Sequence, residues 1–188
     1  MTLSDRTCVV TGASRGIGRA IAEEFGRHGA SVVVNYRSSG EMANETVDRI
    51  EAAGGSAVPA QADVSDGDDV RAAEHGRLID VSSVVGQQGN YGQANYATTK
   101  SGLFGFTRTL ALEMAASGST ANCVAPGFVE TDMLETVPER VKEKILRRIL
   151  LNRFATPEDV AGIVRFVASE DAGCMTGQIL AVNGGMDR

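Results

Sequence analysis

A tyrosine and a lysine four residues apart, Tyr96 and Lys100, are the pair in this sequence best suited to chemistry. If their segment is helical, residues at this spacing lie on one face of the helix. An ammonium group beside a phenol stabilises the phenolate, so the hydroxyl becomes a usable proton donor or acceptor near neutral pH. Ser83, thirteen positions earlier, could hold a substrate carbonyl beside that phenol. Taken alone, the pair also fits a surface lysine beside a packed tyrosine.

Three further features change the interpretation of this pair. They are the serines just before it, a glycine-rich turn near the N-terminus, and Pro126-Gly127 further on. The stretches involved read TGASRGIG, SSVVGQQGNYGQANYATTK, VAPGFVETDM and GQILAVNGGM. Together they resemble the short-chain dehydrogenase/reductase family, and most of all its 3-oxoacyl-acyl-carrier-protein reductases. The resemblance covers residues 5–71 and 76–186.

This resemblance implies the reduction of a β-keto acyl thioester by NADPH. Tyr96 would donate a proton to the developing alkoxide, Ser83 would hydrogen-bond the same oxygen, and Lys100 would activate Tyr96 and hold the nicotinamide ribose. We prefer Ser83 to Ser82 because its distance from Tyr96 matches the family, and we set Tyr91 aside. The thioester would be carried by acyl carrier protein or by CoA.

The glycine-rich turn predicts a site for the cofactor. It follows a short apolar run at residues 7–10, which is typical of a buried strand, and it opens a helix. Glycines let a backbone approach a pyrophosphate, and a helix N-terminus offers free N–H groups and a positive dipole end. An ordinary strand–helix turn is the alternative. The expected cofactor contacts here are Gly12, Ser14, Arg15, Gly16, Ile17 and Gly18.

The ends of the next two expected strands bear on the choice of cofactor. No carboxylate follows Val34 at the end of the strand at residues 31–36, where NAD-binding folds usually place one. Arg37 and Arg15 could instead flank a 2′-phosphate, which favours NADP(H). The strand at residues 56–62 is closed by Asp63, and the resemblance places Asp63 and Val64 against the adenine. The alternative is that Asp63 caps the following helix.

Residues downstream of the catalytic pair complete the expected site. By resemblance, Pro126 and Gly127 end a strand on the cofactor side, and Val129 and Thr131 contact the nicotinamide carboxamide. The charged amphipathic segment at residues 138–152 is predicted to be helical. In the family this region covers the substrate, and a packed surface helix is an equally good interpretation.

Composition excludes several other classes of protein. The chain has 188 residues, 43% of them hydrophobic, and a formal charge of −6. It has no basic run that would favour nucleic acid, no apolar run near the roughly 20 residues of a membrane span, and no recognisable leader. Its three cysteines are widely spaced, which favours reduced thiols in a cytoplasm. No cluster has the spacing of a metal site.

The alternation of strands and helices predicts an α/β fold with a Rossmann-type, doubly wound parallel sheet. We expect residues 1–188 to form a single NADP-binding reductase domain. The resemblance implies a homotetramer, because the long helix after Tyr96 and the C-terminal GQILAVNGGM correspond to subunit contacts in the family.

One departure from the family pattern lies near residues 71–76. In the family this interval holds a central strand, an Asn-Asn-Ala-Gly motif, and a long helix with an asparagine of the catalytic set. At least about 30 residues are therefore missing. Either the slot stays empty or the flanking strands close up and pair directly. We expect the native protein to contain the missing segment, and we expect a polypeptide of these 188 residues alone to show no measurable reductase activity. The alternatives are another ketone or alcohol, such as acetoacetyl-CoA, and a non-catalytic dinucleotide scaffold or sensor.

Overall fold

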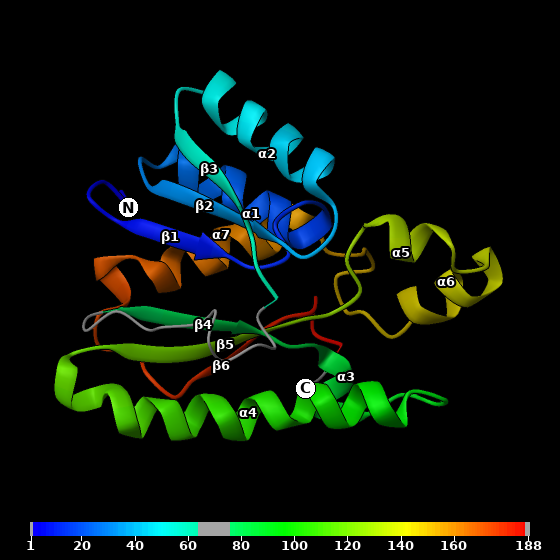
Figure 1. The fold of residues 1–188 in the computed structure, drawn as a ribbon. Helices are drawn as coiled ribbons and strands as arrows, with labels where there is room; N and C mark the ends of the chain where they lie inside the picture. Colours follow the sequence, from blue (N-terminus) through cyan, green and yellow to red (C-terminus); the bar gives the residue numbers. More distant parts are fainter. Residues whose placement is uncertain (1, 64–75, 187–188) are drawn as a thin grey trace. The chain divides into compact units, whose positions relative to one another are not determined.

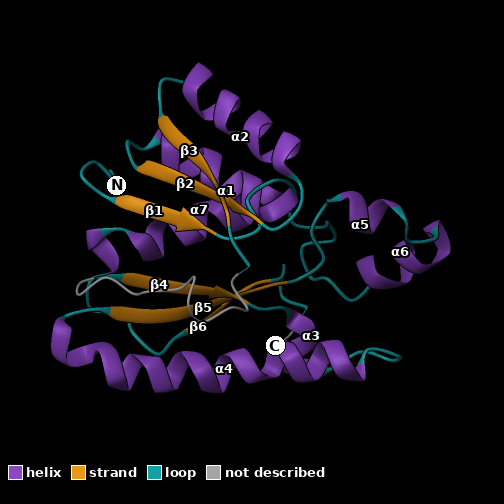
Figure 2. Ribbon diagram, in the orientation of Figure 1, coloured by secondary structure: helices purple, strands orange, loops and turns teal. Residues whose placement is uncertain are grey.

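The computed structural model describes residues 2–63 and 76–186, in which helices alternate with parallel strands (Figures 1 and 2). These residues fall into two compact units. Unit 1 comprises the described residues up to 63 together with Ser169–Asp171. Unit 2 comprises the remaining described residues, from 76 to Ala168 and from Ala172 onward. The expectation of a single domain over residues 1–188 stays a prediction.

Unit 1 is a β-α-β-α-β half of a dinucleotide-binding fold. Its elements are β1 (Thr7–Val10), α1 (Gly16–Arg27), β2 (Ser31–Tyr36), α2 (Gly40–Ala52) and β3 (Ser56–Gln61). The strands form a parallel sheet in the order β1-β2-β3. The helices connect successive strands of this sheet and pack against them.

The core of unit 1 lies between this sheet and its two helices. Helix α1 packs against β2, where Val32 and Val34 are buried. Ile21 and Phe25 of α1 are also buried and lie four residues apart, as the pattern predicted. A methyl group at Gly26 of α1 would come within 2.5 Å of the Cγ2 atom of Ile50 on α2. Glycine at this position therefore lets the two helices approach closely.

Unit 2 is a three-layered half. Its elements are β4 (Arg77–Val81), α3 (Val84–Gln88), α4 (Ala94–Met114), η2 (Ala115–Ser117), β5 (Thr120–Pro126), α5 (Asp132–Glu135), α6 (Glu139–Leu146), α7 (Pro157–Ala168), η3 (Glu170–Ala172, of which only Ala172 belongs to unit 2) and β6 (Ile179–Val182). The sheet order is β4-β5-β6, and every pair is parallel. Helix α4 packs on one face of this sheet and α7 on the other (Figure 1). All seven residues of β5 are buried, as expected of a central strand.

The helix predicted at residues 138–152 is shorter in the structure. Helix α6 ends at Leu146, and turns follow it. These turns bury Ile149 in a cluster with Val84, Val85 and Met186. The amphipathic pattern continued past residue 146 because Ile149 is a core residue, although its backbone is no longer helical.

The strands of the described residues pair as two sheets of three, β1-β2-β3 in unit 1 and β4-β5-β6 in unit 2. Among the described strands, β1 has only β2 as a neighbour and β4 has only β5. These are the two strands that would flank the missing central strand of a Rossmann-type fold. The fold is therefore α/β and Rossmann-type with parallel sheets, and the described part of the chain contains no strand at that place. The break itself and Val64 lie outside the described residues.

Candidate active site

Ser83 lies just beyond the end of β4, where it begins helix α3. Its side-chain Oγ accepts a hydrogen bond from the N–H of Val85 at 3.2 Å, and 8% of the residue is exposed. No described residue accepts a hydrogen bond from the Ser83 hydroxyl. The N-cap position thus fixes the serine oxygen and leaves its proton available for a carbonyl oxygen.

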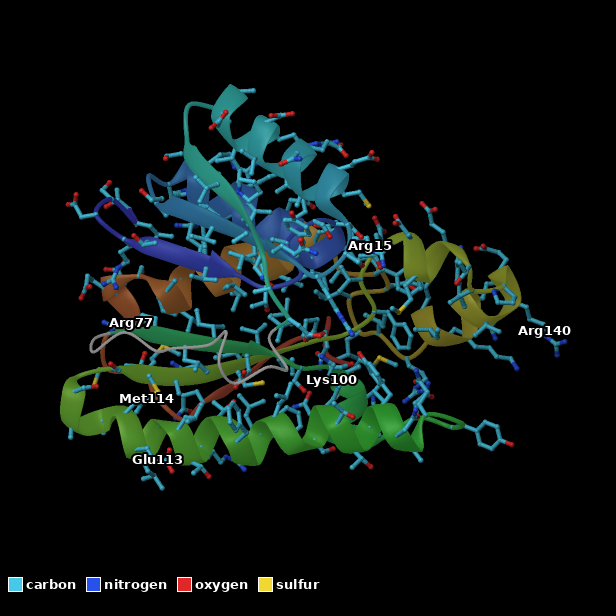
Figure 3. The ribbon with its side chains drawn as sticks, viewed as in Figure 1. Arg15, Arg77, Lys100, Glu113, Met114 and Arg140 are labelled. Carbon is cyan, nitrogen blue, oxygen red and sulfur yellow. The ribbon has the colours of Figure 1, made fainter. Side chains whose placement is uncertain are left out.

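Tyr96 and Lys100 lie one turn apart near the start of α4, as their spacing predicted. The Lys100 ammonium is 5.8 Å from the centre of the Tyr96 ring, and it donates a hydrogen bond of 2.9 Å to the carbonyl of Val81 (Figure 3). Val81 is the last residue of β4, two residues before Ser83. Lys100 therefore connects the helix with the tyrosine to the strand end with the serine.

The contact between α3 and α4 holds this arrangement. Ser82 donates its hydroxyl proton to the backbone carbonyl of Lys100 at 2.7 Å, and Ser101 donates to the carbonyl of Gly86 at 2.5 Å. A methyl group at Gly86 would lie 2.8 Å from the backbone carbonyl carbon of Lys100, so only glycine fits there without a backbone shift. Ser82 is thus engaged in packing. Tyr91, also set aside, is fully exposed.

Asp80 on β4 is an acidic residue near this site that was not predicted from the sequence. Its carboxylate accepts a hydrogen bond of 2.6 Å from the hydroxyl of Thr107, a fully buried residue of α4. Burial raises the pKa of Asp80, against the opposing effects of the Thr107 hydrogen bond and the Lys100 charge. In register with Asp80, Cys123 on β5 has its pKa raised to about 11, chiefly by burial and then by the Asp80 charge. The sequence signal that could have indicated Asp80 is an acidic residue among the apolar residues at the end of a strand.

The end of β5 presents the second group of expected contacts in unit 2. Pro126 closes the strand, and Gly127 then runs close to β6: its N–H donates to Val182, and a methyl group there would lie 2.9 Å from the Cα of Asn183. Val129 is buried and forms a bridge with Ala155. Because β4 and β5 are parallel, the two strand ends lie at the same edge of the sheet.

Thr131 is the N-cap residue of α5, and its hydroxyl lies 3.4 Å from the carbonyl of Val129. With Pro126 and Gly127 these residues belong to the edge of the sheet where ligands bind in open α/β folds. Their expected contact to a nicotinamide carboxamide stays a prediction.

The glycine turn in unit 1 has the geometry that a phosphate site requires. Gly12 has a φ of +64°, and a methyl group at Gly18 would lie only 2.4 Å from the carbonyl oxygen of Gly12. Within the described residues of unit 1, Arg15 at the N-cap of α1 makes no side-chain capping hydrogen bond. The first N–H groups of α1, at Gly16 and Ile17, therefore remain available to an anion.

Arg37 and Asp63 meet at the same edge of the unit 1 sheet. Arg37 follows β2, Asp63 follows β3, and the arginine Nε lies 3.1 Å from a carboxylate oxygen. Both side chains are well exposed, at 80% and 38%. The sequence showed no acid directly after β2, but the parallel sheet brings one from the next strand. Ser14 of the turn is buried, and Arg15 is exposed.

Comparison with known proteins assigns the family. The profile described as "short chain dehydrogenase" matches residues 6–75, and the profile described as "Enoyl-(Acyl carrier protein) reductase" matches residues 71–187. The chain belongs to the short-chain dehydrogenase/reductase family. It is thus a short-chain oxidoreductase by descent, which confirms the resemblance seen in the motifs.

The curated relatives include several bacterial reductases. The chain is 35% identical to the 3-oxoacyl-[acyl-carrier-protein] reductase FabG of Staphylococcus aureus, over 96% of this chain and 98% of the relative. It is 36% identical to the Pseudomonas aeruginosa enzyme of the same name, over 99% of each. Among solved structures, it resembles the promiscuous reductase LugOII of lugdunomycin biosynthesis with a TM-score of 0.89 at 26% identity, covering 99% of both chains.

Another solved structure bears on the cofactor. It is titled as a putative NAD(P)-dependent gluconate 5-dehydrogenase from Beutenbergia cavernae with bound NADP. This chain matches it with a TM-score of 0.90 at 31% identity, over 98% of both chains.

The alignments also confirm the missing segment. The alignment to the Staphylococcus aureus relative spans 240 residues, whereas this chain has 188. The two family profiles meet at residues 71–75, where the sequence departs from the family pattern. The relatives therefore contain a stretch that this chain does not.

Neither a membrane-spanning helix nor a metal-binding cluster occurs in the described residues. None of the helices in the described part of the chain is long and apolar enough to cross a membrane. In the same residues, no group of three or more histidines, cysteines, aspartates or glutamates could hold a metal ion.

The raised pKa of Asp80 predicts a pH-dependent stability. A folded-state pKa above the ordinary carboxyl value means that the folded chain loses stability relative to the unfolded chain as pH rises through that interval. Asp80→Asn removes this loss. We expect the Tm of the variant minus that of the wild type to increase from pH 4 to pH 7, as measured by thermal unfolding. Asp48→Asn, which removes an exposed carboxylate on α2, is the control, and a pH-independent difference for Asp80→Asn would contradict the prediction.

Proposed function

We propose that this chain carries the catalytic groups of an NADPH-dependent reductase of β-keto acyl thioesters, of the 3-oxoacyl-acyl-carrier-protein reductase type. The observation that carries the proposal is the grouping of Ser83, Tyr96 and Lys100 around the end of β4. The relatives named as 3-oxoacyl-[acyl-carrier-protein] reductases support the substrate class. Acetoacetyl-CoA and other ketones remain alternative substrates.

Each residue has a definite role in this reaction. The bound dinucleotide supplies the hydride. Ser83 donates a hydrogen bond to the substrate carbonyl, and Tyr96 gives its hydroxyl proton to the oxygen as negative charge develops on it. Lys100 stabilises the resulting phenolate through its positive charge. The carbonyl of Val81, which accepts from the Lys100 ammonium, and the Ser82 hydroxyl, which donates to the Lys100 carbonyl, keep Lys100 in place for this role.

Unit 1 fits the dinucleotide. The close approach of Gly18 to Gly12 and the uncapped start of α1 are suited to a pyrophosphate. Arg37 and the exposed Arg15 suit the additional phosphate of NADP(H). An exposed ion pair is worth about 0–1 kcal/mol, so the contact of Arg37 with Asp63 is weak enough for a phosphate to replace it.

The missing central strand favours a second candidate function for the 188-residue polypeptide. Chemistry by the family mechanism requires the reacting groups to be positioned closely, since a displacement of about 1 Å can cost about 10²-fold in rate. Within the described residues, each unit has its own three-stranded sheet, and no described strand links the two. A dinucleotide-binding scaffold or sensor without turnover is therefore the alternative, and the missing segment decides between the two.

We expect the 188-residue polypeptide to oxidise no measurable NADPH with an acetoacetyl thioester. We expect a segment-restored chain, in which the stretch missing near residues 71–76 is supplied from the Staphylococcus aureus relative, to do so. Comparing acyl-carrier-protein and CoA thioesters in that chain identifies the carrier. Intact-protein mass must read 19.7 kDa for the unrestored polypeptide. Turnover at that mass would disprove the requirement for the segment, and inactivity of both folded chains would disprove the reductase function.

In the segment-restored chain, Tyr96→Phe removes the proton donor and keeps the ring. General acid catalysis typically contributes about 10²–10⁴-fold, so we expect kcat to fall by that factor while NADPH still binds. Tyr91→Phe removes the same hydroxyl from a fully exposed tyrosine and should leave kcat unchanged. Activity of Tyr96→Phe within a few-fold of the parent chain would rule out Tyr96 as the acid.

The preference for NADPH over NADH can be measured as the ratio of their dissociation constants in the 188-residue chain, without restoring the missing segment. A hydrogen bond to a charged group contributes about 1.5–3 kcal/mol, so we expect Arg37→Ala to weaken NADPH by roughly 10–100-fold and NADH by little. Isothermal titration calorimetry gives both Kd values. Arg140→Ala, an exposed arginine on α6 in unit 2, is the matched control (Figure 3). Equal Kd values for NADPH and NADH in the wild type would contradict the assignment.

We further propose that the chain assembles into a homotetramer through α4. This 21-residue helix has only Thr107 and Ala111 fully buried among its side chains, while Phe106 is 50% and Leu112 82% exposed. Such exposed apolar side chains on one helix are typical of a contact surface. We expect Leu112→Glu to give a smaller species by light scattering, and Met133→Glu on α5 to have no effect. A monomeric wild type at micromolar concentration would contradict this proposal.

A further inference from the structure

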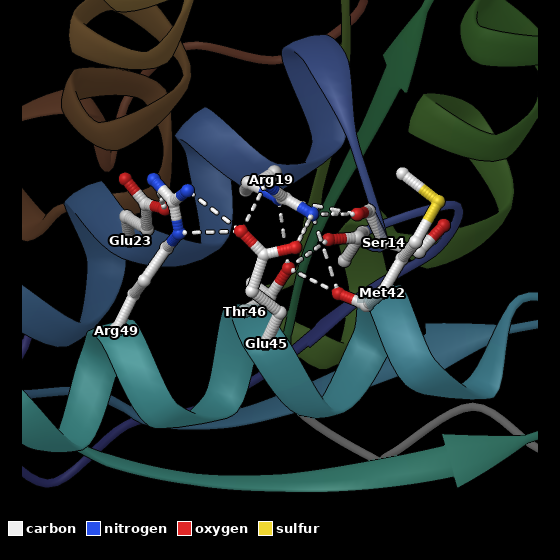
Figure 4. A network of polar contacts seen from close by, with 8 residues as sticks. Ser14, Arg19, Glu23, Met42, Glu45, Thr46 and Arg49 are labelled. Carbon is white, nitrogen blue, oxygen red and sulfur yellow. Dashed lines mark hydrogen bonds and ion pairs between the residues drawn. The ribbon is translucent and has the colours of Figure 1, made fainter.

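Arg19, in the first half of α1, directs its guanidinium group back toward the glycine turn (Figure 4). Its Nε and Nη2 atoms both donate to the backbone carbonyl of Ser14, at 3.1 and 2.6 Å. Its Nε also donates to the hydroxyl of Thr46 at 3.0 Å, and Nη2 lies 3.4 Å from the carbonyl of Met42. The arginine therefore joins the turn to α2.

Thr46 on α2 holds the preceding residue of the turn. It is fully buried, and its hydroxyl lies 3.2 Å from the carbonyl of Ala13 and 3.0 Å from that of Met42. The N–H of Ala13 donates to Asn35 on β2 at 3.1 Å. The N–H of Ala13 is thus engaged inside unit 1, its carbonyl shares the single Thr46 hydroxyl proton with the carbonyl of Met42, and the carbonyl of Ser14 is engaged by Arg19.

These contacts decide which backbone groups the turn presents to a ligand. A carbonyl oxygen pointing outward would repel a phosphate, whereas the N–H groups at the start of α1 attract one. We propose that Arg19 and Thr46 are positioning residues for the cofactor: they hold the carbonyls of Ser14 and Ala13 inward, so that the turn offers the pyrophosphate only donors. This inference rests on the proposed function.

Charge neutralisation keeps Arg19 in this role. The Glu45 carboxylate accepts hydrogen bonds of 3.3 and 3.2 Å from the Arg19 guanidinium and of 3.1 and 2.7 Å from Arg49. The pKa of Glu45 is lowered first by the Arg49 hydrogen bond and then by the Arg19 charge. With its donors committed to Glu45, Thr46 and the turn, Arg19 is not available to bind a 2′-phosphate. Its effect should thus be the same for NADPH and NADH.

The test is a comparison of nucleotide affinities in the complete chain. Arg19 is replaced by Lys, which keeps the charge but loses the forked donors, and by Met. Since hydrogen bonds to charged groups contribute about 1.5–3 kcal/mol, each variant should weaken NADPH and NADH by the same factor, about 10–100-fold. Arg37→Ala, in contrast, should change the ratio of the two Kd values.

Thr46 gives a second, conservative pair of variants. Thr46→Val keeps the shape and removes the hydroxyl, so both nucleotides should bind several-fold more weakly. Thr46→Ser keeps the hydroxyl and should bind like the wild type. Arg49→Ala is the matched control, because Arg49 belongs to the same ion-pair network but bonds to Glu45 and not to the turn. It should leave both Kd values unchanged.

Two measurements separate positioning from a loss of folding. Thermal unfolding shows whether each variant is folded at the temperature of titration, and hydrogen exchange reports on the turn directly. Faster exchange confined to residues 12–18, with both affinities reduced equally, supports the inference. If the wild type binds and Arg19→Lys and Thr46→Val bind equally well, the positioning role is wrong while the proposed function stands. If the wild type binds neither nucleotide, the cofactor assignment fails and the positioning role fails with it.

Discussion

Backbone hydrogen bonding within a parallel sheet is the constraint on which the rest of this structure depends. A strand in the middle of a sheet needs a neighbour on each side, because unpaired N–H and C=O groups are costly when buried. In the described residues of this chain, the central strand expected of the family is absent, and the strands pair as one sheet of three in each unit. Each half has its own parallel sheet with helices packed on it. The hydrogen bonds and side-chain packing within each half therefore do not depend on the missing strand.

In each half, the candidate site residues lie at the carboxyl ends of the strands. Unit 1 has its glycine turn after β1 and an arginine after β2. Unit 2 has a serine just after β4 and a Pro-Gly step at the end of β5. This common placement follows from parallel topology, in which all strands point the same way and their ends form one edge. The side chains of both edges are then fixed by contacts within their own unit.

Two buried polar contacts supplement the expected site residues. Thr107 and Asp80 place a carboxylate within the strand that leads to Ser83. Arg19 and Thr46 hold the carbonyls of the glycine turn. The Thr107–Asp80 and Thr46–Ala13 contacts each join a helix to a segment far from it in the sequence, whereas Arg19 and Ser14 are only five residues apart. Pairs that are distant in sequence follow no periodic pattern. The sequence therefore indicates the glycine turn and Ser83 but not the side chains that hold them.

The sequence by itself determined the alternation of strands and helices, the family, the placement of Tyr96 and Lys100 on one helical face and the missing segment. These follow from local signals: apolar periodicity, glycine spacing, and a motif that ends abruptly. Only the tertiary structure showed that Arg37 meets Asp63, that the Ser82 hydroxyl donates to the carbonyl of Lys100 on α4, and that the described strands pair as two sheets. The physical reason is that each of these outcomes depends on which segments distant in sequence become neighbours, and local pattern carries no information on that.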